Sequence, residues 1–304
     1  MVDKLSLIGK RSLKSIAAPL LRNLPITRYR FKQGSSKPVL LLAYHRVVKD
    51  IALAEKESIN GLVISTKSFE NHLEIVRETY DIVSFDEAIE CLKGNKTMNR
   101  GVAAITFDDA YRDVYDHAWP VLKKLGLPAI VYVPTALVMN SGLLDHDRLY
   151  WLVLKAREKN IDLSAQLTKA GISLERKSGH SASHSILHTV DTLYYQTTQV
   201  RKQVMQCLEE AIKPEKVKYP ESVQLMTWKM VREMFAEGIT FGAHSEHHPV
   251  LTLESTQFAE REILGSKREL QDQLGAEVRH FAYPNGCYNQ SVKQLVAAAG
   301  FETS

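Results

Sequence analysis

Four apolar runs in this sequence end in side chains that can bind a metal ion or transfer protons. The runs and the residues that end them are AYHR (His45), TFDD (Asp108, Asp109), GAHSEHH (His244, His247, His248) and FAYPNG (Tyr283, Pro284). In parallel α/β barrels, the loops at the carboxyl ends of the strands converge on one face of the molecule. We therefore expect these side chains to share a site.

His244 and His248 are four residues apart, a spacing that lets two imidazoles meet one cation. Two imidazoles and a carboxylate are a common ligand set for zinc and other divalent metals, and Asp109 can supply the carboxylate if the strand ends are adjacent. A divalent cation would then neutralise one aspartate and leave the other free as a base. The alternative is that Asp108 and Asp109 only cap the helix that follows, because Asp is favoured at helix N-termini.

A second histidine cluster competes for the role of metal site. His180, His184 and His188 repeat at four-residue spacing within GHSASHSILH. This segment is rich in serine, and no predicted strand leads into it. We therefore favour the cluster at His244.

The elements that must position these residues alternate between strand and helix. The predicted strands are 39–45, 81–85, 101–107, 128–134, 239–244 and 278–284, and the predicted helices between and after them are 68–79, 86–93, 111–126, 227–238, 256–274 and 289–300. This alternation predicts a parallel sheet or barrel. A helical and polar insertion interrupts the pattern at about 140–222, with long helices predicted over 147–158 and 193–212.

The composition is that of a globular protein with a basic arm. The chain has 304 residues, of which 44% are hydrophobic and 24% are charged, and we expect one barrel domain over 38–304. Residues 1–37 hold nine Lys or Arg against a single acid, Asp3. The rest of the chain is slightly acidic, which argues against a nucleic-acid-binding surface on the domain.

The apolar residues of the first 24 positions recur near helical spacing between basic residues. This pattern predicts an amphipathic arm that contacts a membrane surface, or alternatively one that packs on its own domain. No apolar stretch approaches the roughly 20 residues of a membrane span, and no signal-peptide pattern is present. Three widely spaced cysteines give no disulfide framework. We therefore expect a cytoplasmic protein, which would be peripheral to the inner face of the membrane if residues 1–24 form the membrane-contacting arm and not the packed one.

Two motifs resemble those of the polysaccharide deacetylases of carbohydrate esterase family 4, which include chitin and peptidoglycan deacetylases. TFDDAY resembles the first family motif, Thr-Phe-Asp-Asp-Gly, and HSEHH is similar to the second, His-Ser/Thr-x-x-His. The similarity runs from Val39 to Phe301 apart from the insertion, and it is strongest to members found among exopolysaccharide-synthesis proteins. It implies a distorted (β/α)7 barrel that removes N-acetyl groups from amino sugars of a polysaccharide, an oligosaccharide or a lipid-linked glycan.

The resemblance also implies a role for each site residue. Asp108 would be the general base, while Asp109, His244 and His248 would hold a divalent metal, usually zinc. The segment that ends at Tyr283 would supply a backbone N–H for the oxyanion, and Ser245 would support the ligand imidazoles through hydrogen bonds.

The sequence departs from the family pattern at three places. Ala110 replaces the usual glycine, and Ala282 replaces an arginine that tunes the base, so that either Arg279 substitutes for it or the base is untuned. The last family motif, a strand with a general-acid histidine, is missing, so we expect a barrel that is incomplete at its C-terminal end. His45 is the candidate acid, although it could also be a partly buried core histidine. The alternative to an enzyme is a catalytically inactive relative that binds glycans or assists polysaccharide synthesis.

Overall fold

The computed structural model of the protein describes residues 38–169, 171, 186–213 and 217–304. The predicted basic arm of residues 1–37 and the histidines at positions 180 and 184 lie outside the described residues. Within the described ranges, no helix has both the length and the apolar character needed to cross a membrane.

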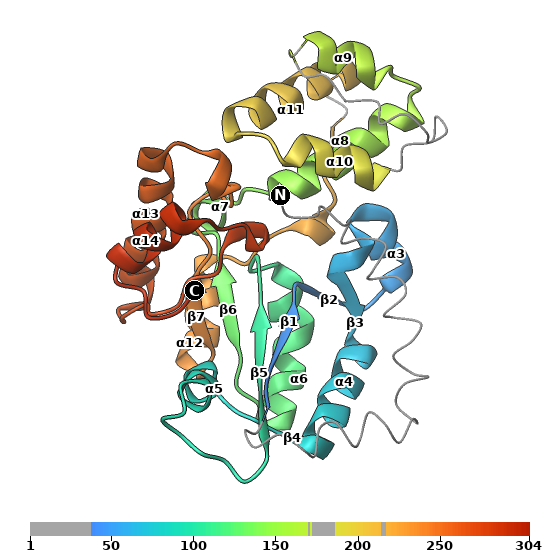
Figure 1. Cartoon of the computed structure of the whole chain (residues 1–304). Coiled ribbons are helices and arrows are strands. Elements are labelled where there is room, and N and C mark those ends of the chain that lie inside the picture. The colour runs from blue at the N-terminus through green and yellow to red at the C-terminus, as the bar shows by residue number, and fades with distance from the viewer. Residues whose placement is uncertain (1–37, 170, 172–185, 214–216) are drawn as a thin grey trace.

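A parallel five-stranded sheet forms the centre of the fold (Figure 1). Its strands are β1 (Val39–Tyr44), β4 (Tyr80–Ile82), β5 (Gly101–Phe107), β6 (Ile130–Val133) and β7 (Thr240–Ala243). The hydrogen-bonded order is β1-β5-β6-β7, and β4 pairs with the beginning of β5. Two short strands that the sequence did not indicate, β2 (Arg46–Val48) and β3 (Val63–Ser65), form a separate parallel pair. The predicted alternation of strand and helix around a parallel sheet is confirmed.

Strand β5 is the centre of the sheet because it pairs with three other strands. β1 runs beside it from Val102 to Phe107, β4 pairs with its first residues, and β6 pairs with Thr106 and Phe107. Every residue of β5 after Gly101 is buried. A strand that is covered on both faces needs a continuous apolar run, which GVAAITF supplies. The two aspartates that follow are therefore held at a well-fixed strand end.

Beyond β7 the sheet continues through two single bridges. Phe281 pairs with Ala243, and Thr303 pairs with His280, both in parallel. The strand predicted for 278–284 is much shorter than expected, because the chain turns into a short 3-10 helix at Pro284. Thr303 begins to pair at the position where the sequence predicts a further strand.

Side chains join this edge of the sheet to the start of helix α5 (Phe85–Leu92). Asp86 Oδ2 lies 2.7 Å from Arg279 Nη2, and Asp86 Oδ1 lies 3.0 Å from His280 Nε2. We call these three residues the seam. Since α5 directly follows β4 in the chain, the seam links the two sides of the sheet. The fold is the predicted distorted barrel of the (β/α)7 type.

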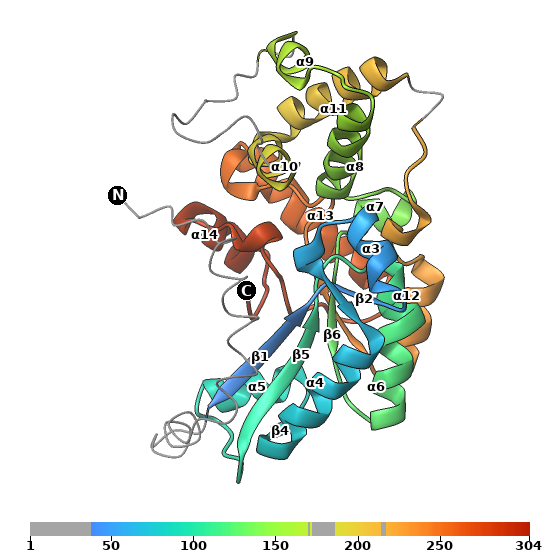
Figure 2. The ribbon, with the colours of Figure 1, turned by 90° about the vertical axis from the view of Figure 1, so that its right-hand side faces the viewer.

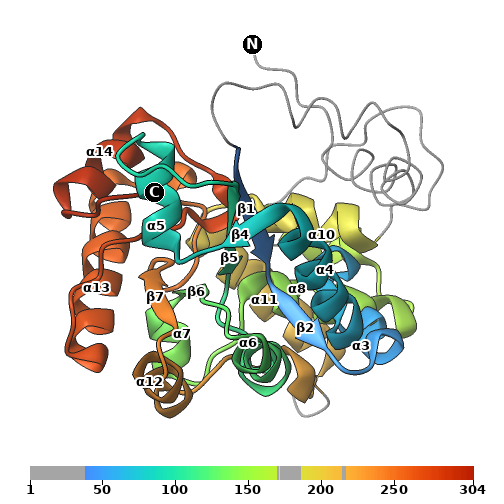
Figure 3. The same cartoon turned by 90° about the horizontal axis from the view of Figure 1, so that it is seen from below.

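Helices cover the outside of the strands, as the two turned views show (Figures 2 and 3). Besides α5, they are α3 (Ile51–Glu57), α4 (Thr66–Thr79), α6 (Trp119–Leu125), α7 (Thr135–Met139), α12 (Trp228–Ala236), α13 (Thr256–Leu274) and α14 (Gln290–Ala298). Ser65, Ser84 and Ser255 cap α4, α5 and α13, each by accepting a hydrogen bond from a backbone N–H of the first turn. The helix predicted over 111–126 begins instead with a turn and a π-helical segment, Val114–Ala118, before α6.

The predicted insertion is a layer of helices above the carboxyl ends of the strands (Figures 1 and 2). Its helices are α8 (Asp145–Glu158), α9 (Leu163–Lys169), α10 (Ile186–Tyr194) and α11 (Thr198–Ile212). They enclose an apolar core of their own, which also receives Val250 and Cys287 from the barrel loops. The single helix predicted over 193–212 is wrong. The chain breaks at Thr197, whose side chain caps α11, and this break separates α10 from α11.

Candidate metal centre

Strand ends bring the predicted ligands together. Asp109 lies two residues beyond the end of β5, and His244 directly follows β7. β6 separates these two strands, so their side chains meet above its end. His248 lies near His244 because the chain turns back on itself between these two residues.

Three buried atoms form a small triangle. The Nε2 atoms of His244 and His248 are 3.1 Å apart. Asp109 Oδ1 lies 3.2 Å from Nε2 of His248 and 3.6 Å from Nε2 of His244. Ligands bound to tetrahedral zinc at about 2.0–2.1 Å are separated from one another by about 3.3 Å. The triangle therefore has the size of one face of a zinc coordination sphere, and the three residues form a candidate metal-binding group.

Two of these three atoms are acceptors that carry no proton. The Nδ1 atom of His244 lies 2.8 Å from the carbonyl oxygen of Ala282, which can only accept, so this nitrogen carries the hydrogen and Nε2 keeps a lone pair. Asp109 Oδ1 is buried and has no hydrogen-bond partner in the described part of the chain. Acceptors that face one another in a dry site need a cation between them. The donor set therefore fits a divalent metal.

Burial shifts the pKa values of these groups toward their neutral forms. It raises the pKa of Asp109 well above its ordinary value, and the charge of neighbouring Asp108 adds to the effect. It lowers the pKa of His244 to about 4 and that of His248 well below the usual range. Neutral imidazoles are the form that binds a metal, and a bound cation would keep the carboxylate ionised.

The backbone around the triangle is strained. Asp109, Ser245 and His248 have positive φ angles of 73°, 63° and 57°. Ala110 has a φ angle of 52°, so the position where the family motif carries glycine is left-handed here as well. Residues other than glycine reach this region at a cost, which is tolerated where the surrounding structure fixes the chain.

Asp108 and His45 form a second, more open pair beside the triangle. His45 Nε2 lies 3.7 Å from Asp108 Oδ2, and their side chains are 31% and 25% exposed. Burial raises the pKa of Asp108, and the nearby His45 opposes this shift. His45 is therefore partly buried, as the alternative to a catalytic role also expects. Unlike Asp109, both groups can reach a molecule at the surface.

Glu262 of α13 is a site residue that the sequence did not reveal. Its buried carboxylate accepts hydrogen bonds from the backbone N–H groups of Glu246 and His247, at 3.0 and 2.8 Å, and lies 2.8 Å from Nδ1 of His247. These contacts hold the loop between the two ligand histidines. They also account for the second group of potential ligands, formed by Glu246, His247 and Glu262. The bond to Glu262 raises the pKa of His247.

The remaining predicted site residues are placed as follows. Ser245 Oγ accepts a hydrogen bond from the backbone N–H of His248 at 3.0 Å, so it shapes the turn and does not bond to either imidazole. The backbone N–H of Tyr283 donates to no protein group in the described ranges and stays available as an oxyanion donor. The expectation that Arg279 tunes Asp108 is wrong, because its guanidinium binds Asp86 in the seam.

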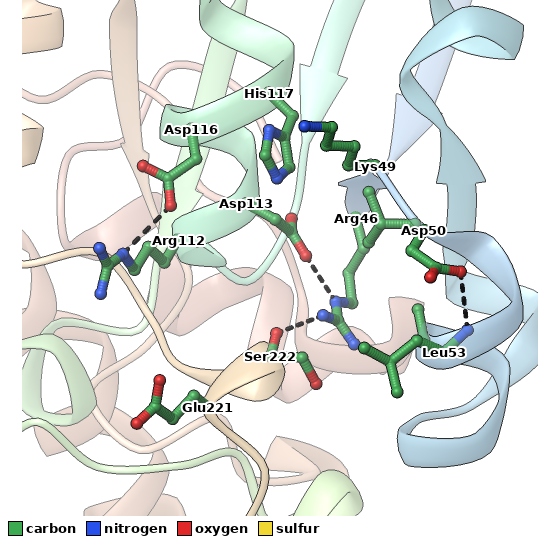
Figure 4. Close-up of a pocket in the computed structure, with 12 residues that line it drawn as sticks. Arg46, Lys49, Asp50, Leu53, Arg112, Asp113, Asp116, His117, Glu221 and Ser222 are labelled. Carbon is green, nitrogen blue, oxygen red and sulfur yellow. Dashed lines mark hydrogen bonds and ion pairs between the residues drawn. The ribbon is translucent and has the colours of Figure 1, made fainter.

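A cavity of about 330 Å³ lies on another side of the barrel (Figure 4). Four of its charged groups form ion pairs: Arg46 Nε donates to Asp113 Oδ2 at 2.8 Å, and Arg112 lies 3.1 Å from Asp116. Lys49, Asp50 and Glu221 add further charges of both signs, and none of the triangle residues lines the cavity. This mixed lining shows no preference for a ligand.

Comparisons with known proteins agree with this fold. The model of the polysaccharide deacetylase family matches residues 95–220 and 212–304. A putative polysaccharide deacetylase of Bacillus subtilis (strain 168), YxkH, is 33% identical over 102 residues, which are 33% of this chain and 33% of that protein. The matched part thus spans about a third of the length of this curated relative.

Solved structures share the fold at low identity. The Streptococcus pyogenes deacetylase PplD, solved with acetate, is 20% identical with a TM-score of 0.56, and the match covers 88% of this chain and 82% of that one. IcaB from Ammonifex degensii is 19% identical with a TM-score of 0.54 and the same coverage. A de-N-acetylase from Aggregatibacter actinomycetemcomitans is 18% identical with a TM-score of 0.52, over 86% and 85% of the two chains.

The fold and the Asp-His-His triangle define a hydrolase-type barrel with a candidate metal-binding group at the carboxyl ends of its strands. The chain belongs to the polysaccharide deacetylase family.

Proposed function

We propose that this protein is a metal-dependent hydrolase that removes N-acetyl groups from the amino sugars of a glycan. The observation that carries the proposal is the triangle of Asp109, His244 and His248 with the spare carboxylate of Asp108 beside it. Two imidazoles and one carboxylate favour zinc among the divalent ions. Family membership and the acetate in the PplD structure support amide hydrolysis at an acetylated sugar.

The residues of this chain divide the reaction between them. Asp109, His244 and His248 would hold a divalent cation, which would supply Lewis-acid activation of the acetamide carbonyl and of the attacking water. Asp108 accepts the proton of that water, and its raised pKa makes it a stronger base than an exposed carboxylate. The Tyr283 N–H stabilises the negative charge that develops on the carbonyl oxygen. His45, beside Asp108, donates a proton to the leaving amine.

Two substitutions separate the role of the base from that of a ligand. Asp108→Asn should abolish acetate release from N-acetylated amino-sugar oligomers and keep the zinc content of the wild type, because Asp108 lies outside the triangle. His244→Ala should lose both acetate release and zinc. Asp116→Asn, on the exposed helical segment after β5, is the matched control and should keep both.

Equal zinc loss in the Asp108 and His244 variants would contradict the assigned roles. A wild-type protein that binds zinc and releases no acetate from any oligomer in the panel would favour the inactive, glycan-binding alternative.

A further inference from the structure

The helical insertion contributes a side chain to the metal centre. Tyr194, the last residue of α10, is 4% exposed. Its hydroxyl lies 2.8 Å from Nδ1 of His248 and 3.0 Å from the carbonyl oxygen of the same residue. The side-chain amide of Asn285, in the loop after Tyr283, donates to the same hydroxyl at 3.0 Å. One phenol thus joins a metal ligand, a barrel loop and the insertion.

The hydroxyl of Tyr194 has one proton, and two of its three contacts compete for it. The carbonyl oxygen of His248 can only accept, whereas Nδ1 can accept or donate, and the Asn285 amide donates to the phenol oxygen. When the hydroxyl donates to the carbonyl oxygen, Nδ1 carries the imidazole hydrogen and donates to the phenol oxygen, so that Nε2 keeps the lone pair that a metal needs. In that arrangement the phenol oxygen accepts from His248 as the Ala282 carbonyl oxygen accepts from His244.

The insertion holds Tyr194 rigidly. The buried guanidinium of Arg201 lies 5.0 Å from the centre of the Tyr194 ring and donates to the Tyr194 carbonyl oxygen at 3.3 Å. Arg201 in turn binds Asp145, at the start of α8, at 3.0 Å. The ring of His146 packs edge-on against both Tyr194 and His248, with centroids 5.8 Å apart in each case. The phenol therefore cannot turn away from His248 without disturbing the insertion core.

We propose that Tyr194 is a positioning residue that fixes His248 as a metal ligand, and that the insertion is thereby an energetic part of the metal centre. The inference rests on the proposed metal-dependent function. Partners that orient a ligand imidazole commonly change metal affinity by about 10–100-fold when they are removed. Because coupling is reciprocal, a cation in the triangle also stabilises the docked position of α10.

The test compares Tyr194→Phe with Tyr150→Phe. Tyr150 belongs to the same apolar core of the insertion and takes no part in the hydrogen bonds of the metal centre. Zinc affinity is measured by competition with a chromogenic chelator, at a temperature where circular dichroism shows each metal-free variant to be folded. Tyr194→Phe should bind zinc about 10–100-fold more weakly, and Tyr150→Phe should match the wild type.

The visible absorption spectrum of the cobalt-substituted protein is a second measurement, which a loss of packing alone would not change. The visible absorption of Co²⁺ in the site should shift or weaken in Tyr194→Phe, because the freed imidazole can turn or change tautomer, and should be unaltered in Tyr150→Phe. Wild-type affinity together with a wild-type cobalt spectrum in Tyr194→Phe overturns the inference and leaves the proposed function intact. Equal zinc binding by the wild type and His244→Ala overturns both.

A second variant covers the case in which Tyr194→Phe does not fold. Asn285→Gly removes the amide that binds the phenol, and glycine accepts the φ angle of 58° at this position. It should weaken zinc binding less than Tyr194→Phe but measurably. Unchanged affinity in this variant, with Tyr194→Phe unfolded, also counts against the inference.

Discussion

Asp109 is a buried candidate ligand that should destabilise the metal-free protein. Its Oδ1 atom faces the Nε2 atoms of two imidazoles, has no hydrogen-bond partner in the described ranges, and belongs to a residue with a left-handed backbone. A buried acceptor without a donor costs about 1–3 kcal/mol. This cost disappears when a cation fills the triangle, so the metal-free protein should be the strained form.

Asp109→Asn should therefore have opposite effects with and without metal. In a chelator, the amide can donate to the Nε2 atoms of His244 and His248, and the free energy of unfolding should rise by about 1–3 kcal/mol. In zinc, the variant should lose the stabilisation that the wild type gains from the bound ion. Chemical unfolding with and without zinc measures both effects. A variant that is less stable than the wild type in chelator would show that Asp109 is not strained.

At the scale of single residues, the sequence predicts which residues form the site better than it predicts which side chains contact them. Asp108, Asp109, His244 and His248 follow from strand ends and histidine spacing, and the structure brings them together. Tyr194 carried no signal, because it lies at the start of a segment that is predicted as one long helix. Spacing in a sequence reports which residues share a strand end, but it does not report contacts between segments that are distant in the chain.

Among the elements, α13 has a larger role than covering the barrel. Glu262 projects from its buried face and accepts hydrogen bonds from two consecutive N–H groups of the ligand loop. Gly265, one turn further on, leaves room for the carboxylate of Glu246, which a side chain at that position would meet. The helix therefore fixes the backbone that presents both ligand histidines.

Glu262→Gln tests this role of α13. Both backbone N–H groups donate to the same oxygen, Oε2, so an amide that keeps its oxygen there turns its NH₂ group toward Nδ1 of His247 and loses the bond to that imidazole. The protein should therefore lose about 1–3 kcal/mol of unfolding free energy. Zinc should also bind more weakly, since the ligand loop would be less well fixed. Glu260→Gln, an exposed neighbour on the same helix, is the matched control and should change neither quantity. Unaltered stability and zinc affinity in Glu262→Gln would contradict the role of α13.

The elements that were predicted well are those with a local signal. The continuous apolar run of β5 and the serine caps of α4, α5 and α13 fix their positions. Strands β2 and β3 were missed, because three residues are too few to show a period. The break at Thr197 was missed because both flanking segments favour helix, and only the packing of Tyr194 against the barrel shows why the chain must turn there.

At the scale of the whole molecule, the seam joins the segment between α13 and α14 to the first half of the barrel. His280 is 2% exposed, packs against the ring of Phe85 at 5.0 Å, and contacts Asp86. Burial lowers the pKa of His280 below its ordinary value, although Asp86 opposes this shift. The folded protein therefore binds this proton less readily than the unfolded chain.

The seam should make stability depend on pH in a defined direction. Because the folded-state pKa of His280 is depressed, its contribution is present above the unfolded value of about 6.5 and is lost as the pH falls below it. His280→Gln should therefore lose less unfolding free energy than the wild type between pH 7.5 and 5.5. Urea unfolding of both proteins in chelator, at several pH values, isolates the difference. Parallel pH curves would mean that His280 titrates alike in both states.

The position of β6 between the two ligand-bearing strands has a consequence for biogenesis. Asp109 is synthesised long before His244, and the insertion is made in between, so no newly made segment holds the full ligand set. The ligands meet only after β5, β6 and β7 have assembled around an apolar core that contains no ligand. The protein would therefore fold first and bind the metal ion afterwards. Metal supply in the cell would then limit how much of the folded protein is active.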